Sequence, residues 1–193
     1  MKKFELTSEF ITNTFGVKLF RIKALIEFGS IKAGELGGYI EKEENLSQDG
    51  NAWVYGNARV YGNARVYGDA EVYGNARVYG DAEVYGDARV YGDAEVYGDA
   101  RVYGDARVCG DAWVYGNADY AVAQGFGSEY RVTTFFRTKN GEVRVKCGCF
   151  YGNLTEFRKG VKKTHGETKR AKEYLMLADL MEYRFSGEEK VDE

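Results

Sequence analysis

Residues 56–73 read Gly-Asn-Ala-Arg-Val-Tyr, Gly-Asn-Ala-Arg-Val-Tyr, Gly-Asp-Ala-Glu-Val-Tyr, and this six-residue unit recurs without a gap from Gly50 to Tyr115. Eleven consecutive copies follow the pattern Gly-Asn/Asp-Ala-x-Val-Tyr, with Cys109 in place of one tyrosine. A unit of six residues is too short to bury its own valine, so it must stack on copies of itself. The period therefore decides the fold of the central part of the chain.

Two architectures fit this period, and both place Ala and Val on one side of a short strand and x and Tyr on the other. In a meander, each Gly-Asn or Gly-Asp would be a hairpin turn, but one layer of such hairpins would expose a whole Val/Ala face. In a solenoid, three units form one triangular coil of eighteen residues, and the Val and Ala side chains bury one another. We favour the solenoid.

The six-residue period extends upstream of the repeats. Ile40 and Leu46 continue it, and Gln48 and Asp49 then form a two-residue insertion. With the eleven valines this makes thirteen rungs, slightly over four coils, and a height of roughly 20 Å at the usual strand spacing. An aliphatic residue with a small residue four positions later, as in Val54 and Ala58, resembles the hexapeptide-repeat proteins. That resemblance implies a mainly β fold, the left-handed parallel β-helix.

Stacking every third unit sorts the outward side chains into columns. The tyrosines form three columns, which we expect to act as stabilising aromatic ladders: Tyr55, Tyr73 and Tyr91; Tyr61, Tyr79, Tyr97 and Tyr115; Tyr67, Tyr85 and Tyr103. The x positions form three more, in which charges of opposite sign largely alternate: Trp53, Glu71, Arg89 and Arg107; Arg59, Arg77, Glu95 and Trp113; Arg65, Glu83, Arg101 and Asp119.

These x columns hold the candidate binding residues of the solenoid. Arg59 lies over Arg77 without a counterion between them, so a phosphate or carboxylate could bridge the two guanidinium groups; two splayed surface arginines are the alternative. Trp53 and Trp113 add aromatic surface at the two ends of the array. The corners stack aspartates, which we interpret as turn residues rather than a cation site: Asp69, Asp87 and Asp105; Asp93 and Asp111; Asp81 and Asp99.

The segments on either side of the array differ from it in composition. Residues 1–49 are predicted to form an N-terminal β cap with the first rungs, because a solenoid end exposes strand edges and core valines. Within the cap, residues 18–28 alternate as a strand. Residues 50–120 are assigned to the solenoid, residues 121–128 to a glycine-containing linker, and residues 187–193 to an acidic tail.

Residues 129–186 are predicted to form a small ββαα module. Residues 130–138 and 142–150 alternate around Asn140-Gly141, a hairpin signal. Asn153 can cap a helix over residues 154–164, and residues 168–185 have amphipathic helical spacing. A basic cluster falls where the two helices meet, which fits nucleic acid or an acidic protein surface, with a solvated helical face as the alternative: Lys162, Lys163, Lys169, Arg170 and Lys172.

Composition bounds the remaining possibilities. The chain of 193 residues has a net charge of -3, which argues against a general polyanion binder. The N-terminal Met-Lys-Lys-Phe is not followed by an apolar run, and no segment approaches membrane-spanning length. Three cysteines do not make a disulfide framework, and Cys147 and Cys149 fit half-buried thiols. We therefore expect a cytoplasmic protein, or one in the host cytoplasm if a phage encodes it, with no membrane association, metal or cofactor.

The residues give little support for catalysis. Resemblance to hexapeptide-repeat acyltransferases implies a histidine base, and resemblance to the related carbonic anhydrases implies three zinc-binding histidines. This chain has a single histidine, His165, outside the repeats, and no partner for it stands out in the sequence. We therefore predict no catalytic residues and favour a protein that is not an enzyme.

Residues 22–28, 32–40 and 45–48 resemble hexapeptide-repeat proteins of bacterial and phage genomes that are catalogued as transferases. Residues 147–152, with Glu156 and Phe157, resemble a prophage-type module. We expect a non-enzymatic binding protein, encoded by a phage or prophage, that engages a host protein, including one with a defence role, or sequesters a small anionic ligand. The alternative is an acyl- or nucleotidyl-transferase with an atypical interface site; a purely architectural protein is a third hypothesis. We also expect a homo-oligomer, either a trimer or a dimer.

Overall fold

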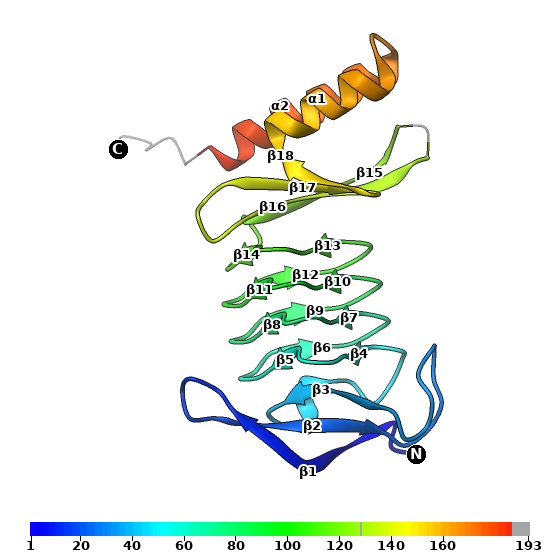
Figure 1. Cartoon of the computed structure of the whole chain (residues 1–193), viewed down its shortest axis with the longest axis vertical. Coiled ribbons are helices and arrows are strands. Elements are labelled where there is room, and N and C mark those ends of the chain that lie inside the picture. The colour runs from blue at the N-terminus through cyan, green and yellow to red at the C-terminus, as the bar shows by residue number, and fades with distance from the viewer. Residues whose placement is uncertain (128, 187–193) are drawn as a thin grey trace. The chain divides into compact units, whose positions relative to one another are not determined.

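The computed structural model describes residues 1–127 and 129–186, so the predicted acidic tail lies outside the described residues. The chain divides into two compact units, Met1–Asn117 and Ala118–Glu193. The first contains a cap and a parallel β-solenoid of about four coils, and the second contains a four-stranded sheet with two helices (Figure 1). The predicted fold class is therefore confirmed.

Each repeat contributes one strand of two residues to the solenoid. Strands one coil apart pair in parallel with an offset of eighteen residues, as in Arg59↔Arg77 and Val60↔Val78, so the meander of hairpins is excluded. The strands are β4 Trp53–Val54, β5 Arg59–Val60, β6 Arg65–Val66, β7 Glu71–Val72, β8 Arg77–Val78, β9 Glu83–Val84, β10 Arg89–Val90, β11 Glu95–Val96, β12 Arg101–Val102, β13 Arg107–Val108 and β14 Trp113–Val114.

The solenoid is filled by the valines and alanines of the repeat. Every valine from Val54 to Val114 is fully buried, and every repeat alanine from Ala52 to Ala112 is at most 1% exposed. Upstream, Ile40 pairs with Val60 and Leu46 with Val66, an offset of twenty residues instead of eighteen. The predicted two-residue insertion accounts for this difference.

The corners depend on glycine. Every repeat glycine from Gly50 to Gly110 has φ between 57° and 75°, a left-handed conformation that other L-residues adopt only at a cost. At Gly74 an added Cβ would also lie 2.9 Å from the backbone nitrogen of Gly92 in the next coil. Gly56 has φ of 57° but nothing within 4 Å of its virtual Cβ. Conformation and crowding therefore both require glycine at position 74, whereas conformation alone requires it at position 56.

The N-terminal cap is an antiparallel extension of one solenoid face. Strands β1 (Phe4–Thr12), β2 (Lys18–Ala24) and β3 (Leu36–Ile40) pair in order, and β3 pairs in parallel with β5. The predicted strand over residues 18–28 ends at Ala24, because the chain turns back there and Phe28 instead pairs with Ile31. The sequence reasoning missed β1, which covers the outer edge of β2.

Buried polar side chains of the cap satisfy the carbonyl groups that the first coil leaves unpaired. The ammonium of Lys3, a residue only 2% exposed, donates to the carbonyl oxygens of Asp49, Gly50 and Ala52, the last at 3.1 Å. On the next face, the Asn45 amide, in the 3-10 helix Glu43–Asn45, donates to two further carbonyls. Both side chains replace backbone donors that another coil would supply.

The C-terminal unit is an antiparallel sheet in the order β15 (Tyr120–Phe126), β16 (Arg131–Arg137), β17 (Val143–Cys147) and β18 (Phe150–Asn153). The linker predicted for residues 121–128 is wrong, because residues 120–126 pair with β16 as β15. The predicted ββαα module therefore has two more strands, β15 and β18. Helices α1 (Leu154–His165) and α2 (Lys169–Phe185) pack on this sheet around Phe135, Phe157 and Tyr174.

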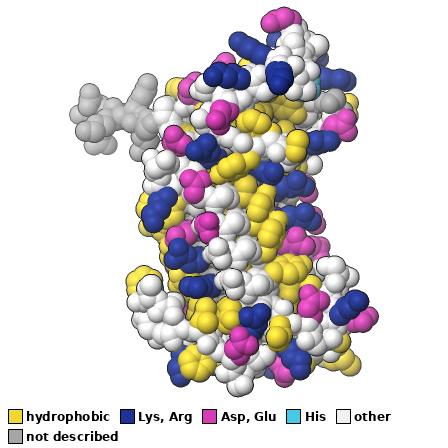
Figure 2. Space-filling view, viewed as in Figure 1, with side chains coloured by type: hydrophobic (Ala, Val, Ile, Leu, Met, Phe, Trp, Pro, Cys, Tyr) yellow, Lys and Arg dark blue, Asp and Glu magenta, His cyan; other side chains and the backbone are white. Residues whose placement is uncertain are grey.

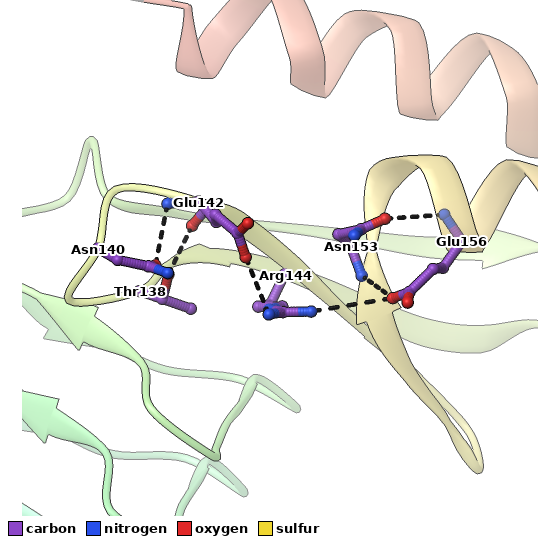
Figure 3. A network of polar contacts seen from close by, with 6 residues as sticks. All are labelled: Thr138, Asn140, Glu142, Arg144, Asn153 and Glu156. Carbon is purple, nitrogen blue, oxygen red and sulfur yellow. Dashed lines mark hydrogen bonds and ion pairs between the residues drawn. The ribbon is translucent and has the colours of Figure 1, made fainter.

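Hydrogen bonds in this unit form at the hairpin turn and at the helix cap that the sequence predicts (Figure 3). The side-chain oxygen of Asn153 accepts from the backbone N–H of Glu156, and the Glu156 carboxylate accepts from the backbone N–H of Asn153, both at 2.8 Å. The predicted helix cap is therefore confirmed as a capping box. Arg144 on β17 forms ion pairs with Glu142, at 2.9 Å, and with Glu156, at 3.8 Å. Arg144 thus connects the hairpin to the start of α1.

We predict that Gly74→Ala destabilises the solenoid more than Gly56→Ala does. Both changes force alanine into the left-handed region, at a cost of about 1 to 2 kcal/mol, and Gly74→Ala adds overpacking against Gly92 of about 1 to 3 kcal/mol. Urea unfolding followed by circular dichroism measures both. Equal losses for the two variants would show that the coils can separate enough to accept the methyl group.

We also predict that stability rises with pH between about 8 and 10.5 because of Lys3. Burial lowers the pKa of Lys3 from 10.5 to about 8, against the opposing attraction of Asp49 and Asp69. In that window the unfolded chain holds a proton that the folded chain has released, so raising the pH favours folding by about 1.4 kcal/mol per pH unit. The unfolding free energy at pH 8.5 and 9.5 should show this slope, and Lys3→Met should remove it. A slope that persists in Lys3→Met would assign it to another group.

Candidate functional site

The outer polar groups of the solenoid largely satisfy one another. On each face a glutamate accepts a hydrogen bond from a tyrosine of the preceding coil and forms an ion pair with an arginine of its own column. The three sets are Glu71 with Tyr55 and Arg89, Glu83 with Tyr67 and Arg101, and Glu95 with Tyr79 and Arg77. The shortest contacts are at Glu95, 2.9 Å from both partners. These groups hold the coils together and are not free to bind a ligand.

The predicted tyrosine ladders are confirmed. Tyr61 stacks on Tyr79 with ring centroids 5.0 Å apart, and Tyr67 stacks on Tyr85 at 4.8 Å. The first rings of one ladder, Tyr55 and Tyr73, meet edge to face. Hydrophobic side chains, a class that includes tyrosine in Figure 2, form a continuous column along the repeats. Because the ring faces contact one another, the ladders offer ring edges to solvent and no flat stacking platform.

The structure brings Arg59 and Arg77 together, as predicted, but with different surroundings. They pair across adjacent coils, and Arg77 bonds Glu95 at 2.9 Å, so one of the two guanidinium groups already has its anion. Arg59 forms no ion pair with any described residue. The pair therefore lacks the open bidentate arrangement that an anion bridge would need.

The two tryptophans have different environments. Trp53 is fully buried between Phe4 and Phe28, whose ring centroids lie 6.2 and 5.3 Å away, so it belongs to the core of the cap and not to an outer binding face. Sequence period alone places it outward, but the cap covers it. Trp113 is 37% exposed and contacts Tyr97. Asp119, assigned to the third column, instead pairs with Arg137 in the C-terminal unit.

The aspartates that stack at the solenoid corners are preceded, on the side of the cap, by asparagines. The side-chain amides of Asn51, Asn63 and Asn75 each donate to an aspartate one coil later, at 2.7 to 3.0 Å. Over residues 1–127 and 129–186, no group of three or more metal-ligating side chains is arranged to hold an ion. The asparagine and aspartate side chains at the corners thus pair with one another from coil to coil.

The predicted basic cluster lies at the end of α1 and the start of α2. All five side chains are exposed, and Lys169 approaches Glu173 at 4.0 Å. The cluster is a solvated positive surface in this unit. Within the described ranges, no helix is both long and apolar enough to cross a bilayer.

A cavity of about 340 Å³ lies in the C-terminal unit, where the ends of β16, β17 and β18 meet the second half of α1. Its apolar wall contains Phe150, Phe157, Val161 and the ring of Tyr174. The remaining lining residues are Glu129, Arg131, Cys147, Gly160, Thr164 and His165. The volume is within the range of about 300 to 1,000 Å³ typical of small-molecule sites.

Polar groups of this cavity differ in how well they are partnered. The Tyr174 hydroxyl donates to the carbonyl of Phe126 at 3.1 Å, and burial raises the pKa of Tyr174 to about 12, so it stays neutral at physiological pH. The Cys147 sulfur accepts from the Thr133 hydroxyl at 3.2 Å. Arg131, by contrast, forms no ion pair with a described residue. It is the cavity's open cationic group.

Glycine at position 160 is not required by packing. Gly160 lies inside α1, where glycine costs about 1 kcal/mol relative to alanine. An added Cβ would meet only Phe150, at 3.7 Å, an ordinary contact. The absence of a side chain there leaves the cavity open, and we attribute the glycine to that space.

None of the residues predicted from the sequence as binding residues lines this cavity. Its walls come from the ends of three strands, the segment before β16 and two helices, which no local period connects. The available signals were the interior glycine of an amphipathic helix and the aromatic pair Phe150 and Phe157 on either side of Asn153. Neither signal identifies a site without the fold.

We predict that the solenoid loses stability as pH rises above about 10. Burial is the largest cause that raises the pKa of ladder tyrosines, including Tyr55, Tyr61, Tyr67 and Tyr73, above the usual 10. Their contribution is complete below pH 10, and it is lost as the pH rises through the folded-state values, because the unfolded chain ionises first. Absorbance of tyrosinate and circular dichroism should change together in a pH titration, best done with Lys3→Met. Ionisation of these four ladder tyrosines near pH 10 in an intact solenoid, beyond the tyrosinate absorbance of the exposed tyrosines, would contradict the burial argument.

Comparison with known families supports the repeat assignment. The family model described as the YdcK beta solenoid repeat matches residues 52–68, 58–72, 70–83 and 94–110, all within the repeats. No curated protein sequence matches the chain. Together the matched segments span residues 52–83 and 94–110 of the solenoid. The chain is a β-solenoid repeat protein, and over its repeats it is similar to the YdcK type.

Proposed function

We propose that this is a non-enzymatic binding protein that takes a small anionic ligand in the cavity of its C-terminal unit. One observation carries the proposal: Arg131, which has no ion-pair partner among the described residues, lines a cavity of about 340 Å³. The glutamates of the solenoid already bind tyrosines and arginines, which favours a scaffold role for that unit. The proposal includes a phage or prophage origin, which rests on the resemblance of residues 22–28, 32–40 and 45–48 and of residues 147–152 with Glu156 and Phe157.

Engagement of a protein is a second candidate function, favoured by an exposed face of α2. Met176, Leu180 and Tyr183 are 70%, 55% and 72% exposed and lie one helical turn apart. The exposed basic residues Lys169, Arg170 and Lys172 precede them. A host protein with an apolar patch and acidic residues beside it fits this surface better than nucleic acid does, since three of its exposed side chains are apolar or aromatic. A second copy of the chain is the competing occupant, and the mass in solution distinguishes the two.

The transferase alternative has one supporting observation. His165, the single histidine of the chain, lines the same cavity as the Cys147 thiol. A histidine beside a ligand site fits a general base. The alternative predicts turnover of acyl-CoA or a nucleotide that His165→Ala abolishes, whereas our proposal predicts stoichiometric binding without turnover.

We predict that at least one member of a panel of nucleotides, organic phosphates and carboxylates binds the full chain at a ratio near one to one. Titration calorimetry should detect it, and Arg131→Gln should weaken the affinity about tenfold or more, as expected for loss of a charge-assisted contact. Lys163→Gln, which removes an exposed charge from α1 outside the cavity, is the matched control. If no anion binds, or if Lys163→Gln weakens binding as much as Arg131→Gln does, the proposal fails.

A further inference from the structure

The cavity walls favour a flat, unsaturated ligand. Phe150 and Phe157 meet at 5.4 Å, Phe157 and Tyr174 at 5.7 Å with an interplanar angle of 87°, and His165 lies over Tyr174 at 5.8 Å. These four rings form a continuous aromatic cluster along the cavity. An aromatic ring placed there gains edge-to-face and offset contacts in addition to burial of apolar area.

One charged group is positioned to recognise an anion at the edge of this cluster. An added Cβ at Gly148 would lie 2.7 Å from Nη1 of Arg131, so the guanidinium group packs directly over the bare backbone of the β17–β18 turn. Gly148 has φ of 56°, which suits glycine and keeps that surface free of a side chain. The guanidinium is therefore held in place while its donors stay available for a carboxylate.

The neighbouring polar groups do not compete with such a ligand. The Tyr174 hydroxyl is engaged with the carbonyl of Phe126, and Cys147 accepts from Thr133. Glu129 is the one carboxylate among the lining residues and is exposed. Residues 128–185 carry thirteen Lys or Arg against seven Asp or Glu, and this local excess of positive charge favours an anionic ligand.

From this arrangement we infer that the cavity binds a small aromatic carboxylate, whose ring packs among Phe150, Phe157 and Tyr174 and whose carboxylate pairs with Arg131. The inference rests on the proposed function and names its ligand class. It also explains Gly160, because any larger side chain at that position would occupy the space of the ring.

The test uses phenylpropionate as the probe. Two compounds serve as comparators: phenylpropanol, which lacks the charge, and propionate, which lacks the ring. Calorimetry on the full chain should show phenylpropionate binding about tenfold or more tightly than either comparator. Arg131→Gln should remove the preference for phenylpropionate over phenylpropanol. Gly160→Leu should weaken both ring-containing ligands about tenfold or more, and Lys163→Gln should change nothing.

A second readout localises the ligand. In a Cys149→Ser background, phenylpropionate should slow alkylation of Cys147, which lines the cavity, and should leave the α-helical circular dichroism unchanged. If Gly160→Leu does not fold, Arg131→Gln, which changes an exposed residue, and the protection of Cys147 still test whether phenylpropionate binds in the cavity. The inference is overturned if phenylpropionate does not bind. It is also overturned if phenylpropionate binds but Arg131→Gln leaves its affinity unchanged and Cys147 is not protected from alkylation.

The outcomes separate this inference from the function on which it rests. Should phenylpropionate fail while a different small anion binds in an Arg131-dependent way, the ligand class is wrong and the proposed function stands. Should no anion bind at all, both are wrong.

Discussion

The parallel stacking of coils at an offset of eighteen residues is the constraint on which the solenoid depends. It places valine over valine inside, as in Val60↔Val78, and outward residues over their counterparts. Burial of the Val and Ala side chains and the backbone ladder both need this offset, and glycine at each corner permits it. Neither contribution is available to a single repeat, because its six residues contact mainly the coils above and below.

The cap shows how the fold deals with the end of such an array. A repeated backbone would leave a row of carbonyl groups without donors, and an exposed edge invites pairing with another chain. Lys3 and Asn45 supply those donors from side chains, and β1 and β2 continue one face with antiparallel pairing. The burial of a lysine here is tolerated because its ammonium group has three carbonyl acceptors.

The sequence predicted the repeats down to individual columns, because a strict period specifies both the neighbours and the direction of each side chain. It also predicted the two helices and the Asn153 cap, whose signals are local. It did not predict β15, since Gly125 and Gly127 resemble a linker and the strand exists only through long-range pairing with β16. The environment of Trp53 and the cavity beside Arg131 were missed for the same reason, because each is assembled from segments far apart in the chain.

The glutamate contacts on the solenoid faces restrict how the array can change in length. Inserting eighteen residues adds a whole coil and leaves every outward side chain in its own column. An insertion after Arg101 also keeps the tyrosine and arginine partners of Glu71, Glu83 and Glu95. Removing a single repeat between Glu71 and Glu95 would instead set these two carboxylates opposite each other, a like-charge pairing that destabilises neighbouring strands. Although the motif repeats every six residues, we conclude that adding or removing whole repeats keeps the outward columns in register only when three repeats, one complete coil, are changed together.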